Sequence, residues 1–164
     1  PQSLFATAYL YHWAFRMNII NLQQKTKPIN GEIEYYWFEN ENVGLKNTLF
    51  HRITILLEPF DSGLEYVNQP EKTEINIEWI NLGLKNPSHL SGIEISSDRT
   101  PDVEASIYIG SAHNWFHIES LILREIARDN YELIGKGIVE FENEGVAKNE
   151  QFHFKTSAIF KGEA

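Results

Sequence analysis

The side chains best suited to chemistry lie in one short run, His113-Asn114-Trp115-Phe116-His117-Ile118-Glu119. On a helix, His113 and His117 would share a face four residues apart, which lets two imidazoles bind one divalent ion. On a strand, His117 and Glu119 would share a face and pair as a base and its orienting carboxylate. The run therefore suggests a metal site or an acid–base pair, although polar groups beside large aromatic rings more often only hydrogen-bond at the edge of a core.

A second set of candidates consists of carboxylates. Glu140, Glu142 and Glu144 alternate along the chain, so we expect them on one face of a strand, as ligands or as an ordinary solvated surface. Calcium loops need oxygen ligands around a tight glycine turn, and Pro101 interrupts the acidic run at 98–104.

Motifs for nucleophilic or phosphate chemistry are absent from the sequence. The pair in Gly135-Lys136-Gly137 lacks the third glycine and the following helix of a dinucleotide site, so it predicts a bulge or a close backbone approach. We therefore assign no catalytic residue and no cofactor.

Aromatic residues make up 13% of the chain, and several are adjacent. Tyr35, Tyr36, Trp37 and Phe38 cannot all face one core in a strand, so the sheet is either covered on both faces or exposes some of them as interface anchors. The predicted partner-binding residues combine this run with the nearby and later carboxylates: Tyr35, Tyr36, Trp37, Glu39, Glu140, Glu142 and Glu144.

The distribution of charge narrows the class of partner. Residues 32–150 contain 22 aspartates and glutamates against nine lysines and arginines, and the whole chain has a formal net charge of −9. A negative field of this size repels nucleic acid and anionic membranes and attracts basic proteins. The sequence does not indicate an oligomeric state.

The cysteine count and the N-terminal region bear on location. The chain has no cysteine, which excludes disulfides and thiolate chemistry and predicts a cytoplasmic protein.

The uncharged stretch at 4–15 is shorter than the roughly 20 residues that span a bilayer. We interpret residues 1–27 as an N-terminal segment that is either a docked helix, with Leu4, Ala8, Tyr11 and Phe15 on one face, or an extension ahead of Met17.

From Pro28 onward the apolar pattern alternates, which is typical of strands. The sequence predicts a single β-rich domain over 28–164, mainly β with α+β left open, built as an antiparallel β-sandwich or an open barrel. Residues 114–128 fit a helix capped by Asn114 or a strand that turns at 128–130, and the neighbouring strands favour the strand. Predicted strands cover 33–38, 49–57, 75–79, 93–95, 103–109, 131–142 and 152–160.

Three classes of function fit these features. The first is a binding or inhibitory protein that captures a basic partner, such as a toxin domain, in the manner of a bacterial immunity protein; this is a likeness of composition and not of family. The second is a sandwich or barrel that binds a carbohydrate or lipid in a pocket lined by Trp37, Trp79 or Trp115. The third is an enzyme that uses His113, His117 and Glu119.

Overall fold

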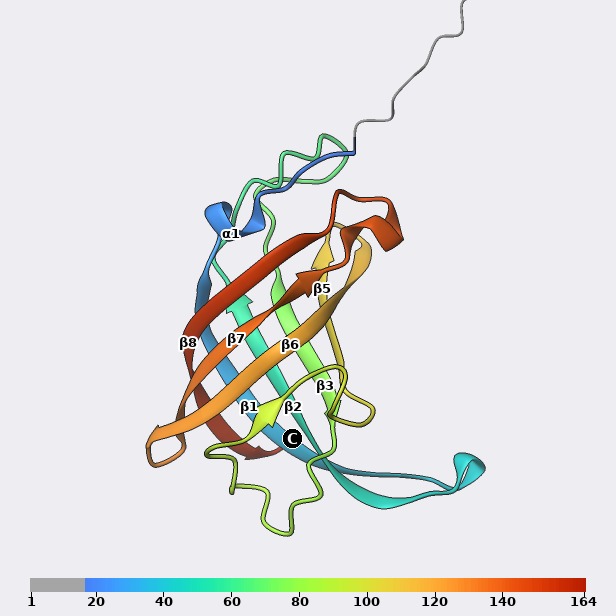
Figure 1. Ribbon diagram of the computed structural model, residues 1–164, viewed down its shortest axis with the longest axis vertical. Coiled ribbons are helices and arrows are strands. Elements are labelled where there is room, and N and C mark those ends of the chain that lie inside the picture. The colour runs from blue at the N-terminus through green and yellow to red at the C-terminus, as the bar shows by residue number, and fades with distance from the viewer. Residues whose placement is uncertain (1–16) are drawn as a thin grey trace, which may run out of the picture.

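The chain forms a closed β-barrel of seven strands (Figure 1). The structure is a computed structural model, and it describes residues 17–164. Neighbouring strands around the barrel follow the order β6, β5, β3, β2, β1, β8 and β7, and the pairing of β7 with β6 closes it. The barrel strands are β1 (Pro28–Asn40), β2 (Leu45–Leu57), β3 (Glu74–Ile80), β5 (Glu104–Ile109), β6 (Ala112–Ala127), β7 (Asn130–Val139) and β8 (Glu150–Glu163).

The expectation of a mainly β fold of the sandwich or barrel type is confirmed, with two refinements. The barrel is closed, and β1 pairs with β8 in parallel, whereas all other strand pairs are antiparallel. The short strand β4 (Glu94–Ile95) pairs with β6 farther along that strand than β5 does. Residues 114–128 lie almost wholly in β6, so the helical alternative for this segment is wrong.

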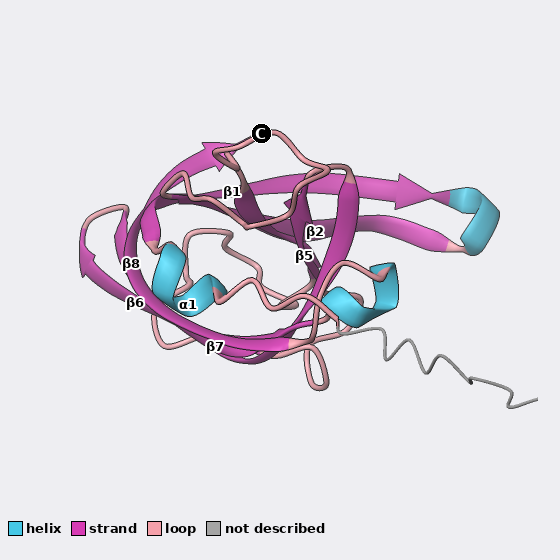
Figure 2. Cartoon of the chain, turned by 90° about the horizontal axis from the view of Figure 1, so that it is seen from above, coloured by secondary structure: helices cyan, strands magenta, loops and turns pink. Residues whose placement is uncertain are grey.

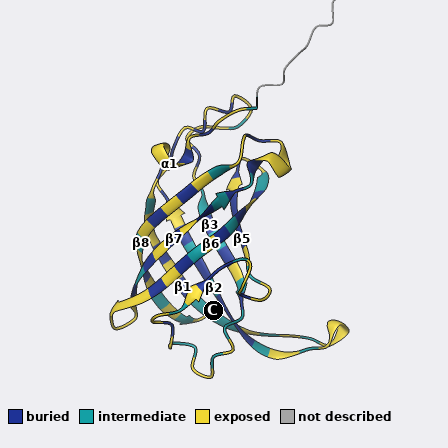
Figure 3. Cartoon of the chain, in the orientation of Figure 1, coloured by how far each residue is buried: buried dark blue, intermediate teal, exposed yellow. Residues whose placement is uncertain are grey.

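Every second residue along the barrel strands points inward, and these side chains fill the barrel. Figure 3 shows buried and exposed residues following one another along each barrel strand. The inward residues are largely isoleucine, leucine and phenylalanine, and they form one continuous core. At Gly135 and Gly137 an inward Cβ would lie 2.4 Å from the Phe154 ring and 2.2 Å from the His117 carbonyl oxygen, respectively, so the predicted close approach is present.

Short elements and loops close both ends of the barrel (Figure 2). Near one end lies α1 (Leu22–Lys25), where the Glu150 carboxylate accepts the backbone N–H groups of Ile20, Asn21 and Leu22 at 2.7–2.8 Å. At the other end, His51 Nε2 donates to the Pro87 carbonyl at 2.7 Å, and the Tyr131 hydroxyl donates to the Ser88 carbonyl at 3.0 Å. Two inward side chains thus hold the β3–β4 loop across the barrel.

Two 3-10 turns complete the described elements. The turn η1 (Glu41–Val43) joins β1 to β2 as a hairpin, and Gly44 follows it with a φ of 70°. This hairpin extends beyond the barrel body as an arm (Figure 1). The turn η2 (Phe141–Glu144) follows β7. The interpretation of residues 1–16 as a helix or an extension lies outside the described residues, and within residues 17–164 no helix has the length and apolarity to cross a membrane.

Candidate functional site

The outer surface of β3, β5 and β6 collects carboxylates and aromatic rings. We call this surface the acidic face. It is built on neighbouring strands, because β3 pairs with β5 and β5 pairs with β6. It consists of Glu78, Asp98, Glu104, Tyr108, His113, Trp115, His117 and Glu140.

Two glutamates of the acidic face oppose each other directly. Glu78 on β3 and Glu104 on β5 are partners in the antiparallel register, and both are exposed. Like charges in this position destabilise a sheet. Neither residue forms an ion pair with any part of the chain that the structure describes, and the same is true of Glu140. Within residues 17–164, three carboxylates of the acidic face therefore lack a cationic partner.

A row of rings crosses the same surface. The Tyr108 and His113 ring centroids lie 5.0 Å apart, and the His113 and Trp115 centroids lie 4.9 Å apart. Tyr108 is 47% exposed and Trp115 is 39% exposed. These side chains point outward because residues 113, 115 and 117 alternate with the buried residues of β6. Half-exposed Tyr and Trp are typical of binding surfaces.

A hollow of about 190 Å³ lies within the acidic face. Its wall contains the carboxylates of Glu104 and Glu140 and the rings of Trp115, Phe116 and His117, and the rest comes from Ser97, Val103 and Ala105. Two carboxylates beside an indole ring suit a cationic group, because the ring face attracts cations and the carboxylates neutralise them. The hollow has the volume of roughly six water molecules, given about 30 Å³ for each.

Hydrogen bonds from backbone and side-chain groups fix the walls of this hollow. The Glu140 N–H donates to the Trp115 carbonyl at 2.8 Å, and the Asn143 side chain donates to Glu140 Oε2 at 2.8 Å. On the other side, Ser97 and Ile118 exchange two hydrogen bonds of 2.9 Å, which dock the loop after β4 onto β6. That loop brings Asp98 Oδ2 to 3.5 Å from His117 Nε2.

An aromatic cluster adjoins the acidic face at Glu78. Tyr36, Phe38 and Phe50 surround the Trp79 ring, with centroids 5.2–6.0 Å from it and planes nearly perpendicular to it. Trp79 has a φ of 57°, which is a rare backbone conformation for a bulky residue and costs about 1–3 kcal/mol. Burial raises the pKa of Tyr36, and the nearby Glu78 carboxylate also raises it. The packed rings hold this part of β3 in place.

The structure places the predicted chemical residues along one strand. His113, His117 and Glu119 lie on β6, where four residues span about 13 Å, so the two imidazoles do not converge as they would on a helix. His117 contacts Asp98, a residue from another segment. Among residues 17–164, no group of three histidine, aspartate or glutamate side chains is arranged to hold a metal ion. Asn114, the cap in the helical alternative, is buried inside the barrel.

The predicted partner-binding residues of β1 separate between two faces. Tyr36 belongs to the aromatic cluster beside Glu78. Tyr35 lies on the opposite face of the strand, with its ring 6.1 Å from Phe160 and stacked on it. Trp37 shares that opposite face and is 49% exposed, and Glu39 lies exposed on the arm. The run of aromatic residues is therefore not one surface.

The predicted row of Glu140, Glu142 and Glu144 does not form, because β7 ends at Val139 and the chain turns into η2. Glu140 reaches the acidic face. Glu142 Oε1 instead accepts the Asn149 N–H at 3.3 Å, which helps close the β7–β8 loop. The alternating glutamates that suggested one strand face therefore lie beyond Val139, where β7 has already ended.

Sequence reasoning missed Glu78, Asp98, Glu104 and Tyr108. The acidic run at 98–104 was the available signal, but which strand lies beside it depends on the register of β3 and β5. The chain matches no family model, and no similar curated protein or solved structure was found. The description of the site therefore depends on geometry and electrostatics alone.

Proposed function

We propose that this protein binds a basic protein partner through the acidic face, with a lysine or arginine of the partner in the hollow between Glu104, Trp115 and Glu140. The observation that carries the proposal is the exposed pair of Glu78 and Glu104. A like-charged pair directly opposite in a sheet lowers the stability of the free protein, and a cation bound beside Glu104 relieves the repulsion. Such a local conflict is more often found at functional sites than elsewhere.

The overall charge supports the same proposal. A chain of net charge −9 accelerates encounter with a positive partner, and the half-exposed Trp115 and Tyr108 provide anchors after contact. Inhibition of a toxin is one use of such a surface, and a cytoplasmic location would suit it. The pocket lined by Trp37, Trp79 or Trp115 finds less support, because Trp79 and Trp37 lie against opposite faces of β1.

The test compares two double variants with equal loss of charge. Glu104→Gln/Glu140→Gln removes carboxylates from the hollow, and Glu39→Gln/Glu163→Gln removes two exposed carboxylates elsewhere. Each variant and the original protein are incubated with a lysate of the native host at 50 mM and 300 mM salt. The proteins that cross-link to each of them are identified and quantified.

We expect a basic protein that is captured by the original protein and by the control variant, and lost with the hollow variant. Its capture should fall at the higher salt concentration, because screening weakens exposed charge interactions. Equal capture by all three proteins would overturn the proposed surface. Loss with the control variant alone would assign binding to the surface that carries Glu39 or Glu163 instead.

A further inference from the structure

A second concave surface lies on the outer face of β6, β7 and β8, where α1 and the start of β1 form a wall. Its volume is about 520 Å³, within the range of about 300–1,000 Å³ that small-molecule sites occupy. We call it the lysine groove. Its lining includes Ser120, Ile122, Ile134, Lys136, His153 and Lys155. Among residues 17–164, no carboxylate lines the groove, although the chain as a whole is acidic.

Strand register arranges the outward side chains of the groove in two adjacent rows. One row is apolar on β6 and β7, because Ile122 is the partner of Ile134 and both side chains are about 40% exposed; on β8 this row ends in Lys155. The next row is polar, because Lys136 lies between Ser120 on β6 and His153 on β8. A polar row beside an apolar row matches a molecule with a head and a hydrocarbon tail.

Most polar groups of the groove already have partners. The Gln23 amide exchanges hydrogen bonds of 2.8 and 3.1 Å with the backbone of His153. Lys155 Nζ lies 2.7 Å from Glu132, and Lys27 Nζ lies 3.6 Å from Glu58.

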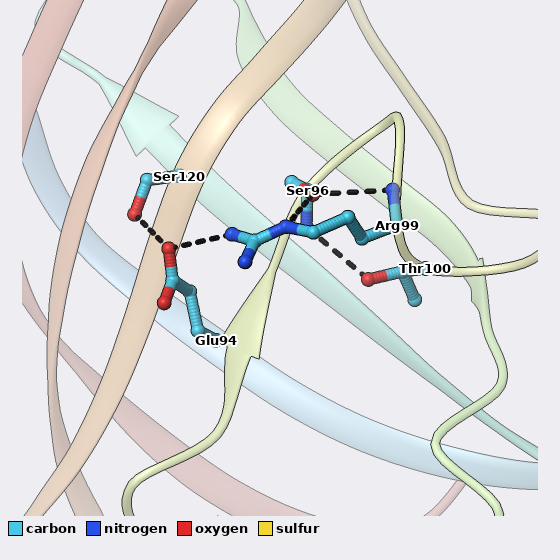
Figure 4. A network of polar contacts seen from close by, with 5 residues as sticks. All are labelled: Glu94, Ser96, Arg99, Thr100 and Ser120. Carbon is cyan, nitrogen blue, oxygen red and sulfur yellow. Dashed lines mark hydrogen bonds and ion pairs between the residues drawn. The ribbon is translucent and has the colours of Figure 1, made fainter.

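The Ser120 hydroxyl is also engaged. Figure 4 shows Ser120 donating to Glu94 at 3.0 Å, while Arg99 donates to the same carboxylate oxygen at 2.9 Å. Arg99 therefore offsets the negative charge of Glu94 beside the groove. Within residues 17–164, the groups of the polar row that lack such a partner are the Lys136 ammonium and the His153 ring.

We propose that the lysine groove binds a free medium-chain fatty acid, with its carboxylate at Lys136 and His153 and its alkyl chain over Ile122 and Ile134. One unpaired cation beside an apolar floor fits one anionic group with a hydrocarbon tail. An acidic peptide would need partners for its own backbone, and the lining leaves few hydrogen-bonding groups for them. Ile122 and Ile134 lie on adjacent strands about 5 Å apart, so a chain of medium length covers both.

Decanoate is the probe for the experiment, and its binding is measured by calorimetry with the full chain. The Lys136→Gln variant should weaken decanoate binding roughly two- to fivefold, as expected for a partly exposed ion pair. Ile134→Gln should weaken it roughly fivefold or more, through loss of apolar contact. The matched controls are Lys161→Gln and Ile159→Gln on β8, neither of which lines the groove, and both should bind like the original protein.

Decan-1-ol should bind more weakly than decanoate to the original protein and lose no affinity in Lys136→Gln. Isotope-filtered contacts between decanoate and the methyl groups of Ile122 and Ile134 should place the chain in the groove. Equal loss in the variants and their controls would overturn the proposal, as would an absence of decanoate binding. Binding only to phosphatidylglycerol vesicles, or a dimer that Ile134→Gln dissociates, would overturn it in favour of a membrane surface or a second copy.

Discussion

Replacing Glu104 by glutamine should make the protein more stable. The substitution keeps the size of the side chain and removes its charge, so Glu78 no longer faces a like charge across the β3–β5 pair. Two unit charges about 6 Å apart in water repel by about 0.7 kcal/mol, and measured cross-strand pairs contribute about 0.2–1 kcal/mol. For a chain of this length, a gain of about 0.7 kcal/mol raises Tm by roughly 1–3 °C.

Thermal unfolding followed by circular dichroism, at 20 mM and 1 M NaCl, measures this gain. It should shrink at 1 M salt, where the Debye length is about 3 Å and exposed charges are screened. Glu78→Gln should give a similar gain, and the double variant little more than either, because one substitution already removes the repulsion. The control is Glu132→Gln, which should lower Tm because Glu132 pairs with Arg124 and Lys155.

A lower Tm for Glu104→Gln, or a gain unchanged at 1 M NaCl, would refute the reasoning. Either result would mean that the two carboxylates do not repel each other appreciably in the folded protein. The exposed pair would then no longer support a site that sacrifices stability for binding.

Three further predictions concern the barrel itself. Gly137→Ala should cost roughly 1–3 kcal/mol in urea unfolding, since its Cβ would lie 2.2 Å from the His117 carbonyl oxygen; a variant as stable as the original would contradict this. Burial lowers the pKa of His51 below its unfolded value of about 6.5, so the unfolded chain binds the proton first as pH falls. The stability contributed by neutral His51 is therefore full above pH of about 6.5 and declines toward the folded-state pKa. The deficit of His51→Asn in urea unfolding should shrink at lower pH, and a deficit that does not change with pH would contradict this. Glu150→Gln should lower the free energy of unfolding by about 1–3 kcal/mol in the same assay, because its carboxylate accepts three N–H groups at the start of α1. An unchanged midpoint would show that water satisfies these N–H groups equally well.

The behaviour of His51 follows from its contacts inside the barrel. The side chain is 2% exposed, and its Nε2–H donates to the Pro87 carbonyl. Its other ring nitrogen, Nδ1, is buried and has no hydrogen-bond partner among the described residues. A second proton there would place an unpaired N–H and a charge in the core, which is why burial favours the neutral ring.

The alternating apolar residues determined the strands and which side of each strand is buried. Ile53, Ile55 and Leu57 face the core of the barrel, as their spacing in the sequence predicts. Residues 114–128 fit either a helix or a strand, because Ile118, Ile122 and Ile126 share one face in both. Pairing with β7 on one side and with β5 and β4 on the other decides it, and such pairing is not visible in a local pattern.

The sequence by itself determined the composition, the acidic charge and the period-two pattern that makes the chain a β protein. Only the tertiary structure decided which carboxylates and rings meet, because Glu78, Glu104 and Glu140 are far apart in the chain and are brought together by strand register and by the end of β7. The same is true of the lysine groove, where Ile122, Ile134 and their neighbours come from three strands. Side-chain direction follows from local alternation, whereas neighbourhood on a barrel surface depends on long-range backbone hydrogen bonds.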